Sequence, residues 1–597
     1  MHKAITVKIR PRQAYSAVSC EFVQPLYPSR GQAVRISLKA ARPWKAMRAR
    51  VSQGGLSSTY DLVSEKDGYW GCSFILNDEM ASWFFELSKG ECVYYLGSDG
   101  LQDTVPNLKR SFIIKADYPH CPWVSEGTCY QIFPDRFKKG LDKPLPSFSF
   151  DGHQAISMNW GDIPLDYEKG HCLDFFQGDL KGIEDSIEHF KALGATALYL
   201  NPIGSSRTTH RYDCTDFFSI DEKLGGDEAY ISLVKALHRS SMHVITDISI
   251  NHTGIDNPWF RKANGDKNAE TDLDEATCRS FYFPRPDGSF DCWASVSTLP
   301  QLNYNSALLR KIIYKDKDSV LRRYLKKPYC QDAWRLDVAS ELGKHDDQDL
   351  CFEVWREVRK SLGNDVYLLG ENWESAEPFL QGDMWSSTMN YYGISRPLRR
   401  FMGEQDRFQA QGWGHAPSQV PPFSCRQLAR ALANGLEAMP PQAMYNAFNL
   451  IDSHDTPRLH NHSEIFSLER YKTAVSIMYL MPGMPSTYYG DEIGLDGRLG
   501  SVEASRYCMQ WDRSKWNMDF YEHYCMLGKL RHDFKDILSY GTVDISCPTE
   551  STMILSRSIR SKSIALLVNQ GSEDVSFVLG KTYREVPAGC SAIVVSE

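Results

Sequence analysis

Ionisable side chains stand in or directly after four short apolar runs, each typical of a buried β-strand. The runs are HVITDISI (243–250), DAWRLDV (332–338), VYLLGE (366–371) and AFNLID (447–452). Together they carry five carboxylates, an arginine and two histidines: Asp247, His252, Arg335, Asp337, Glu371, Asp452, His454 and Asp455. Acidic, basic and nucleophilic groups gathered from separate strands are typical of an enzyme active site.

Carboxylates in this number suit the hydrolysis of a glycosidic bond. One carboxylate attacks the anomeric carbon and a carboxylic acid protonates the leaving oxygen, about 5–5.5 Å apart in retaining enzymes. A third carboxylate can stabilise the oxocarbenium-like transition state and help to keep the acid protonated. Alternate strand residues share a face, so the Arg335 cation can orient Asp337 and keep it ionised. Purely structural roles remain the alternative for Asp247 and His252.

Eight strand-like runs alternate with amphipathic stretches between Cys129 and about Asp536. Such alternation favours right-handed parallel units, and eight units predict a closed α/β fold, the (β/α)8 TIM barrel, over residues 119–538. In this barrel the catalytic groups come from the carboxyl ends of the strands. One connection is long: residues at about 253–300 show little periodicity, which indicates a small inserted domain over the barrel mouth.

Both flanking segments have a different pattern from the barrel. Residues 1–118 show short alternating runs separated by turn signals such as SQGG and SDG, which predicts an N-terminal β-sandwich. Residues 539–597 return to short strands and predict a C-terminal β domain.

Composition limits the partners and the compartment. A formal net charge of −8 leaves no basic stripe for nucleic acid, whereas a neutral sugar is compatible with it. The longest apolar stretch, around Ile477–Tyr489, is too short to cross a membrane, and the first residues lack the apolar core of a signal peptide. The 16 scattered cysteines favour reduced thiols in a cytoplasmic protein.

Five motifs, in order and at fitting spacing, give the chain a resemblance to the α-amylase family of glycoside hydrolases, family 13. They are DISINH (247–252), LPQLN (299–303), WRLDVAS (334–340), GENW (370–373) and DSHD (452–455). Within that family the chain resembles the neopullulanase, cyclomaltodextrinase and maltodextrin glucosidase branch, through YQIFPDRF (130–137), FFQGDLKGI (175–183), HRYDCTDFFSID (210–221) and YYGDEIGLDG (488–497). The stretches KLGGDEA (223–229) and KDSVLRRYLKKPYCQDAWRLD (317–337) are most similar to maltodextrin glucosidases.

The resemblance implies a role for each matching position. Asp337 matches the nucleophile, Glu371 the acid/base and Asp455 the transition-state stabiliser. The residues that match sugar-binding positions are Tyr212 as the aromatic platform, His252, Arg335 and His454 as hydrogen-bonding partners, and Trp373 on the leaving-group side.

The function implied is a retaining α-glycosidase that hydrolyses α-1,4-glucosidic bonds of short maltodextrins. A cyclomaltodextrinase or neopullulanase with α-1,6 or transglycosylation activity is the alternative. A non-catalytic sugar-binding scaffold is a remote third possibility, because such a protein should lack a catalytic carboxylate and all three are present.

Two departures from the branch bear on cofactors and specificity. Where relatives often carry an Asn-Gly-Asp calcium loop, this chain has Lys138-Lys139-Gly140-Leu141-Asp142, so we expect no metal and no other cofactor. The branch tends to place an aspartate four residues before the arginine that matches Arg506, and here that position is Val502, with Glu503 next to it. By analogy with relatives, we also expect a homodimer whose N-terminal domain helps to wall the partner's pocket.

Overall fold

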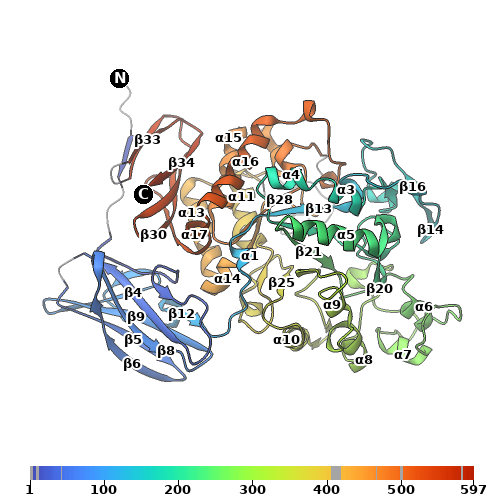
Figure 1. Cartoon of the computed structure of the whole chain (residues 1–597), viewed down its shortest axis with the longest axis horizontal. Coiled ribbons are helices and arrows are strands. Elements are labelled where there is room, and N and C mark those ends of the chain that lie inside the picture. Colours follow the sequence, from blue (N-terminus) through green and yellow to red (C-terminus); the bar gives the residue numbers. More distant parts are fainter. Residues whose placement is uncertain are drawn as a thin grey trace.

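The computed structural model describes residues 5–8, 12–41, 44–404, 419–464, 467–497, 502–579 and 582–596. A central barrel carries two β domains on the same side, as Figure 1 shows. One is built from the blue N-terminal strands and the other from the red C-terminal strands. Among the described residues, none of the helices combines the length and the hydropathy that a bilayer crossing requires.

Eight parallel strands form the barrel, and all eight coincide with runs predicted from the sequence. In chain order they are β13 (Cys129–Ile132), β18 (Ala197–Leu200), β21 (His243–Ile248), β22 (Ala333–Leu336), β25 (Tyr367–Gly370), β26 (Ser387–Thr388), β27 (Phe448–Leu450) and β28 (Met484–Tyr488). The sheet runs β26-β25-β22-β21-β18-β13-β28-β27, and a parallel bridge between Met389 and Phe448 joins its two edges. The barrel prediction is therefore confirmed.

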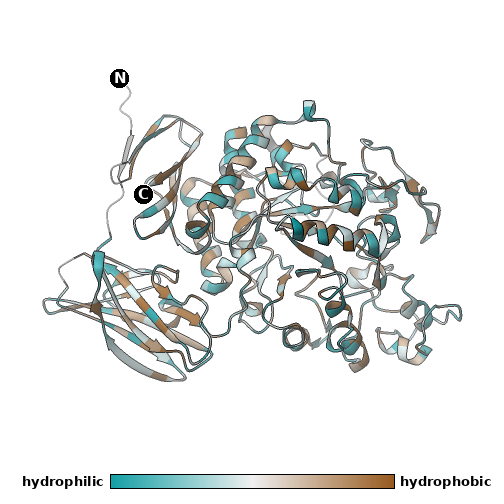
Figure 2. Ribbon diagram, in the orientation of Figure 1, coloured by the Kyte–Doolittle hydropathy of each residue, from teal (hydrophilic) through white to brown (hydrophobic). Residues whose placement is uncertain are grey.

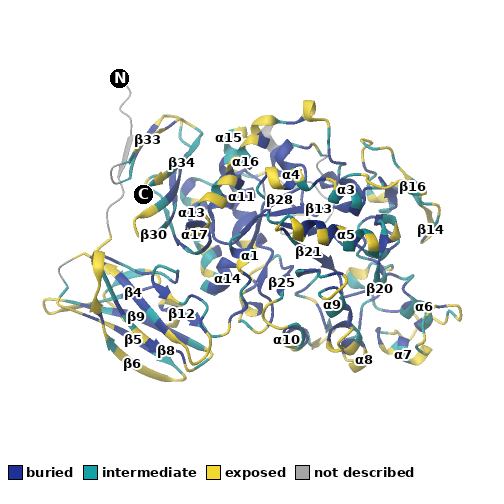
Figure 3. Cartoon of the chain, in the orientation of Figure 1, coloured by how far each residue is buried: buried dark blue, intermediate teal, exposed yellow. Residues whose placement is uncertain are grey.

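The barrel strands are apolar along their length because both of their faces are buried. In β18, Ala197 and Tyr199 belong to the cluster inside the barrel, whereas Leu198 and Leu200 pack outward against the helices. The main helices of that outer layer are α5 (Gly226–Arg239), α10 (Cys351–Leu362), α13 (Cys425–Glu437), α15 (Leu468–Leu480) and α16 (Met518–Asp533). Figures 2 and 3 show that α5 turns apolar, buried residues inward and polar, exposed residues outward.

The residues from Ala14 to Lys115 form two antiparallel sheets that share one core. One sheet contains β2 (Ala14–Tyr15), β3 (Val23–Gln24), β4 (Ala33–Ala40), β7 (Val63–Ser64) and β8 (Tyr69–Ile75). The other contains β5 (Ala46–Gln53), β6 (Leu56–Asp61), β9 (Met80–Lys89), β10 (Cys92–Gly97), β11 (Gly100–Gln102) and β12 (Phe112–Lys115). Leu38 from one sheet and Phe85 from the other lie in a common cluster, as in a sandwich. That cluster also takes in Met444 and Tyr445 of α14 (Pro441–Tyr445), so sandwich and barrel are packed together.

The C-terminal strands form two small sheets. One consists of β29 (Thr542–Ser546), β30 (Thr552–Ile559), β31 (Lys562–Asn569) and β34 (Ser591–Ser596), and the other of β1 (Ile5–Lys8), β32 (Val575–Leu579) and β33 (Thr582–Val586). The first strand of the chain thus pairs in parallel with β32, Ile5 opposite Val575. This pairing was not predicted, since residues 1–118 were assigned to one domain. Pairing between strands at the two ends of the chain leaves no pattern in the local sequence.

Two long connections lie at the carboxyl ends of the strands. The expected one, residues 253–300, contains α6 (Pro258–Ala263), α7 (Glu275–Ser280) and a turn at Trp293–Ser295. Its end is tied to the barrel by a bridge between His252 and Gln301. The other connection, residues 138–176, was not predicted, because its two-residue strands carry no periodic pattern. These strands are β14 (Ser149–Phe150), β15 (His153–Gln154), β16 (Ile156–Ser157) and β17 (Asp174–Phe175).

Candidate active site

Arg335 lies at the centre of the predicted site and contacts carboxylates from three neighbouring strands. Its Nη1 donates to both oxygens of Asp247, at 2.8 and 2.9 Å, and to Asp337 Oδ1 at 2.9 Å. Its Nη2 lies 3.1 Å from Glu371 Oε1. The Arg335 side chain is fully buried, so these charge-assisted contacts act in a medium with little water to screen them.

The two predicted catalytic carboxylates, Asp337 and Glu371, face the same guanidinium. Burial raises the pKa of Asp337 well above its ordinary value, and the charges of Glu371, Asp247 and Asp455 add to the rise, which the Arg335 cation opposes. The Arg335 cation thus favours the ionised form of Asp337, which a nucleophile requires. One carboxylate and one carboxylic acid side by side are what a retaining glycosidase requires.

Backbone geometry helps to hold Glu371. The backbone N–H of Val338 donates to Glu371 Oε2 at 2.8 Å, and the indole N–H of Trp373 donates to Oε1 at 3.2 Å. Val338 has a φ of +50°, a left-handed conformation that a β-branched residue rarely adopts. It directly follows Asp337, and strain of this kind is concentrated at functional sites.

His454 links the platform tyrosine to the predicted stabiliser. Its Nε2 lies 2.6 Å from Tyr212 Oη and 3.2 Å from Asp455 Oδ2. Its Nδ1 faces two amide groups, Gln131 Nε2 at 3.1 Å and Asn201 Nδ2 at 3.0 Å. Burial, followed by the Arg506 and Arg335 cations, lowers the pKa of His454 well below its usual value, so the ring is neutral. Since Nδ1 accepts from the amides, the ring proton is on Nε2 and points toward Asp455 and Tyr212.

Tyr212 lies between β19 (Gly204–Ser206) and β20 (Cys214–Ile220), a hairpin that follows barrel strand β18. Its hydroxyl lies 2.9 Å from Asp247 Oδ2, and its ring is stacked near His454, with centroids 5.8 Å apart. The ring is half-buried, which leaves part of it available to a ligand. The structure therefore brings Tyr212, Arg335, His454 and the carboxylates together.

His252 is placed differently from the other predicted site residues. Its ring is buried, lies 3.2 Å from Ser249 Oγ and is stacked on Trp293, with centroids 5.4 Å apart. Within the described part of the chain, no polar contact joins His252 to Asp337, Glu371 or Asp455. Burial lowers the pKa of His252 to about 3, so the ring is neutral.

Trp373 packs face to face on Tyr391, with centroids 3.6 Å apart. The Tyr391 hydroxyl lies 3.1 Å from Ser453 Oγ. The backbone N–H of Asp455 donates to the same Ser453 Oγ at 3.2 Å. A continuous chain of contacts thus connects Glu371 with Asp455. Tyr391 was missed as a site residue from the sequence, although it is the last residue of the predicted strand run STMNY (387–391).

Several other residues of the site were not singled out from the sequence. Two amides, Gln131 and Asn201, orient His454, and the ring of Trp293 covers His252. Their sequence neighbourhoods indicated only a strand or a loop. Asp247 was noted as a carboxylate with a structural alternative, and the structure shows that it anchors Arg335 through both oxygens. Neutral amides at strand ends carry no spacing signal, so only the fold could reveal them.

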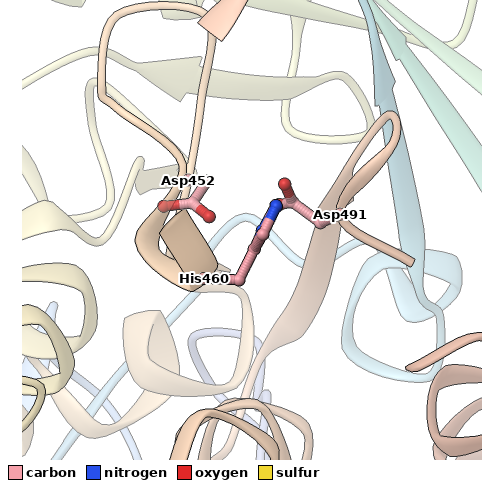
Figure 4. A group of neighbouring side chains, drawn as sticks. All are labelled: Asp452, His460 and Asp491. Carbon is pink, nitrogen blue, oxygen red and sulfur yellow. The ribbon is translucent and has the colours of Figure 1, made fainter. Parts of the chain in front are cut away.

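One buried cluster has the composition of a metal site. Asp452, His460 and Asp491 lie together, with one possible ligand atom of each within 4.8 Å of the others (Figure 4). However, Arg399 donates to Asp452, Arg458 Nη1 donates to Asp491 Oδ1 at 2.7 Å, and His460 Nε2 faces a backbone carbonyl. Each of the two carboxylates thus already has a buried guanidinium partner, and a divalent cation would have to compete with Arg399 and Arg458 for the same oxygens, so it does not fit.

Beside residues 138–142, where the branch often has a calcium loop, the negative charge of Asp179 is balanced by groups of this chain. Asp179 is buried and accepts backbone N–H groups from Gly140, Leu141 and Gly182. The ammonium group of Lys143 lies 2.8 Å from Asp179 Oδ2. Donors therefore surround the carboxylate of Asp179, which leaves few of its lone pairs for a cation.

Comparison with known proteins agrees with this geometry. Residues 131–538 match the family model described as the alpha amylase catalytic domain. An intracellular maltogenic amylase of Bacillus subtilis (strain 168) is 30% identical over 505 residues, which cover 84% of this chain and 77% of that protein. A cyclomaltodextrinase of Geobacillus thermopakistaniensis (strain MAS1) is 31% identical over 479 residues, which cover 79% and 73% of the two chains.

A solved cyclomaltodextrinase structure shares the fold, with a TM-score of 0.70 over 98% of this chain and 99% of its own at 24% identity. The family model spans the barrel that carries Asp337, Glu371 and Asp455. The chain therefore belongs to the α-amylase family of glycoside hydrolases and is an enzyme that hydrolyses glycosidic bonds.

Proposed function

We propose that this enzyme is a retaining α-glycosidase that hydrolyses α-1,4-glucosidic bonds of short maltodextrins. Asp337 is the nucleophile, Glu371 the general acid/base and Asp455 the transition-state stabiliser. The observation that carries the proposal is the double contact of Arg335, which faces Asp337 at 2.9 Å and Glu371 at 3.1 Å. This contact holds both carboxyl groups at one place on the barrel rim.

The reaction follows from these positions in two steps. In the first, Asp337 attacks the anomeric carbon while the bond to the leaving oxygen breaks, and Glu371 gives its proton to that oxygen. In the second, Glu371 takes a proton from water, and the oxygen of that water attacks the anomeric carbon and displaces Asp337. Two displacements at one carbon leave the released sugar in the α configuration.

The neighbouring side chains have matching tasks. The half-buried ring of Tyr212 supplies an apolar face for the sugar that is cleaved, and neutral His454 and Arg335 offer donors to its hydroxyl groups. Trp373 fixes one oxygen of Glu371 and lines the leaving-group side. His252, held by Ser249 and Trp293, reaches the sugar without touching a catalytic carboxylate.

A cyclomaltodextrinase or neopullulanase activity is the second candidate. It is favoured by the relatives, which include a maltogenic amylase and cyclomaltodextrinases, and by a structural neighbour described as a type III pullulan hydrolase from Thermococcus kodakarensis, 23% identical. A non-catalytic scaffold is set aside, because all three carboxylates are present and the relatives are named as enzymes.

Product analysis separates the two candidates. The enzyme is incubated with maltotriose, β-cyclodextrin, pullulan and panose, and the products are resolved over time. Faster turnover of maltotriose than of β-cyclodextrin supports the maltodextrin glucosidase. Faster opening of β-cyclodextrin, or cleavage of pullulan and panose, supports the second candidate.

The surroundings of the enzyme are part of the proposal. We infer that it needs neither calcium nor another cofactor, because Lys143 already neutralises Asp179. We further infer a cytoplasmic homodimer that binds an oligosaccharide and neither nucleic acid nor a membrane. The compartment follows the relative that is described as intracellular, together with the 16 free cysteines of this chain, and the dimer follows the analogy with the branch.

A further inference from the structure

One buried glutamate contacts the predicted site through an arginine. Glu503 stands three residues before Arg506. It lies in a short helical turn, Val502–Ser505, and is 1% exposed. The partners of its carboxylate among the described residues indicate what this side chain does.

Arg506 is the first partner of Glu503 and connects it with the active site. Arg506 Nη1 donates to Glu503 Oε1 at 2.9 Å. The same guanidinium donates through Nε to the backbone carbonyl of His454 at 3.0 Å, and its Nη2 lies 3.4 Å from Asp455 Oδ1. The planar guanidinium of Arg506 thus contacts Glu503, the backbone of His454 and the predicted stabiliser Asp455.

Arg136 is the second partner. Its Nη1 lies 3.6 Å from Glu503 Oε2, and it also donates to the carboxylates of Asp135 and Asp174. All of these side chains are buried. Charges therefore alternate along the row Asp455, Arg506, Glu503, Arg136, and Glu503 is the negative charge that separates two buried arginines.

We infer that Glu503 is a positioning residue for Asp455, which acts by fixing the Arg506 guanidinium between its own carboxylate and that of Asp455. The inference rests on the proposed role of Asp455 as stabiliser. It goes beyond that role because it assigns the orientation of Asp455 to a second residue, which lies outside the predicted catalytic and sugar-binding set. With Glu503 in place, Arg506 can face Asp455 at 3.4 Å and still be drawn to the opposite side, so Asp455 remains available to the positive charge that develops on the sugar.

Loss of the Glu503 charge would change this balance in a defined direction. Arg506 and Arg136 would become two buried cations without the anion between them, and Asp455 would be the carboxylate of the described residues that still faces Arg506. The added positive charge beside Asp455 would favour the ionised forms of nearby carboxyl groups. Among the described residues, the charged or titratable groups that face Glu503 are Arg506, Arg136, Asp174, His210 and Cys172.

The test uses the full-length enzyme with Glu503→Gln, which removes the charge and keeps the shape. We expect kcat on maltotriose to fall about ten- to hundredfold, because Asp455 is displaced, whereas KM changes less than about threefold, because the side chains proposed to bind the sugar are unchanged. We also expect the acid limb of the pH profile of kcat/KM to move to lower pH. Glu503→Asp keeps the charge, so its kcat should lie between those of the wild type and Glu503→Gln. Its pH profile should stay near that of the wild type.

A matched control is Glu404→Gln. Glu404 is equally buried, at 1% exposure, and pairs with Arg399 at 2.7 Å, but Arg399 holds Asp452 and no predicted catalytic carboxylate. We expect this variant to keep kcat within about threefold and to keep the pH profile. Folding of every variant is checked by circular dichroism.

Three outcomes would overturn the inference. The first is a Glu503→Gln enzyme that keeps its kcat and its pH profile, and the second is an equal loss in the Glu404→Gln control with both profiles unchanged. If Glu503→Gln does not fold, a Glu503→Asp enzyme with wild-type kcat would be the third. Asp455→Asn separates this inference from the proposed function: an active Asp455→Asn enzyme removes both, whereas an inactive one beside an unaffected Glu503→Gln removes only the role of Glu503.

Discussion

Arg335 carries a positive charge at a point where three carboxylates meet, and this charge governs how the site holds its protons. Asp247 takes two of its contacts, at 2.8 and 2.9 Å, and so fixes the orientation of the guanidinium. The remaining contacts reach Asp337 and Glu371. A fully buried carboxylate thus serves to aim a cation at the two carboxyl groups that are proposed to do the chemistry.

Replacing either proposed catalytic carboxylate by its amide should abolish turnover. In Asp337→Asn the attacking oxygen is lost, and in Glu371→Gln the proton that the leaving oxygen needs is lost, while the volume of each side chain hardly changes. We expect kcat on maltotriose to fall at least about a thousandfold in each variant, with an unchanged circular dichroism spectrum. A variant that keeps more than about a tenth of the wild-type kcat would contradict the assigned role.

The distance and the stereochemistry give a second check of the same pair. We expect the two carboxyl groups to lie about 5–5.5 Å apart in a crystal structure, and early-time NMR to show the α form of the released sugar. A separation well beyond roughly 6.5 Å, or β product, would indicate the inverting mechanism instead.

Asp247→Asn should shift the acid limb of the pH profile. The negative charge of Asp247 contributes to the raised pKa of Asp337, and activity is lost as the pH falls through that pKa, because the nucleophile becomes protonated. Without this charge the pKa of Asp337 falls, so the acid limb of kcat/KM should move to lower pH by about one unit. A limb that stays in place, or moves to higher pH, would show that Asp247 does not act on Asp337 electrostatically.

At the scale of elements, the strand ends explain why the site could be read from the sequence. The proposed catalytic positions follow buried strands whose apolar runs are distinct, and parallel strands of one barrel must bring their carboxyl ends to one rim. Asp337, Glu371, Arg335 and His454 were found in this way. The residues that support them, such as Gln131 and Tyr391, were not, because their role depends on contacts between strands far apart in the chain.

The same reasoning sets the limits of the fold prediction. Strands with both faces buried gave continuous apolar runs, and each of the eight could be recognised. The connection at 138–176 could not, since its two-residue strands are too short to show alternation. The pairing of β1 with β32 could not either, because an edge strand accepts a partner through its backbone, whatever the side chains.

Gly370 tests how closely strand β25 is packed just before Glu371. A Cβ atom at Gly370 would lie 2.4 Å from two ring carbons of the buried Trp385. We expect Gly370→Ala to lower the free energy of unfolding by about 1–3 kcal/mol or more and to reduce kcat, because the strand end that carries Glu371 must shift. Thermal unfolding and kcat on maltotriose provide the measurement.

Gly204→Ala is the matched control for this prediction. The nearest atoms to a Cβ there are Asp216 O and Cys214 Sγ, both at the ordinary contact distance of 3.8 Å. Its melting temperature should stay close to that of the wild type. Equal stability of the two alanine variants would mean that the Trp385 ring moves aside without cost.

At the scale of the whole molecule, the enzyme should not depend on calcium. Lys143 and three backbone N–H groups already donate to the Asp179 carboxylate. Removal of divalent cations should therefore leave this region unchanged. We expect activity on maltotriose and the melting temperature to be unchanged after dialysis against EDTA. Loss of activity with EDTA and its recovery with calcium, but not with magnesium, would prove this wrong.

The proposed homodimer is tested on the full chain, because the sandwich shares its core with Met444 and Tyr445 of the barrel and its removal would expose them. Light scattering at micromolar concentration should give twice the mass of one chain, with an interface of well over about 1,000 Å² in a crystal. A partner domain that narrows the pocket excludes long polymers, so activity on soluble starch relative to maltotriose should rise when dilution separates the subunits. A monomer at micromolar concentration would remove the dimer.

The pairing of β1 with β32 has a consequence for the order of synthesis. About 567 residues separate Lys8 from Val575, and at about 5–20 residues per second a ribosome needs roughly half a minute to two minutes between them. During that time Ile5–Lys8 has no strand to pair with, although the sandwich that follows it can already fold. The sheet of β1, β32 and β33 therefore cannot be completed until Val586 has been synthesised, long after the strands of the sandwich.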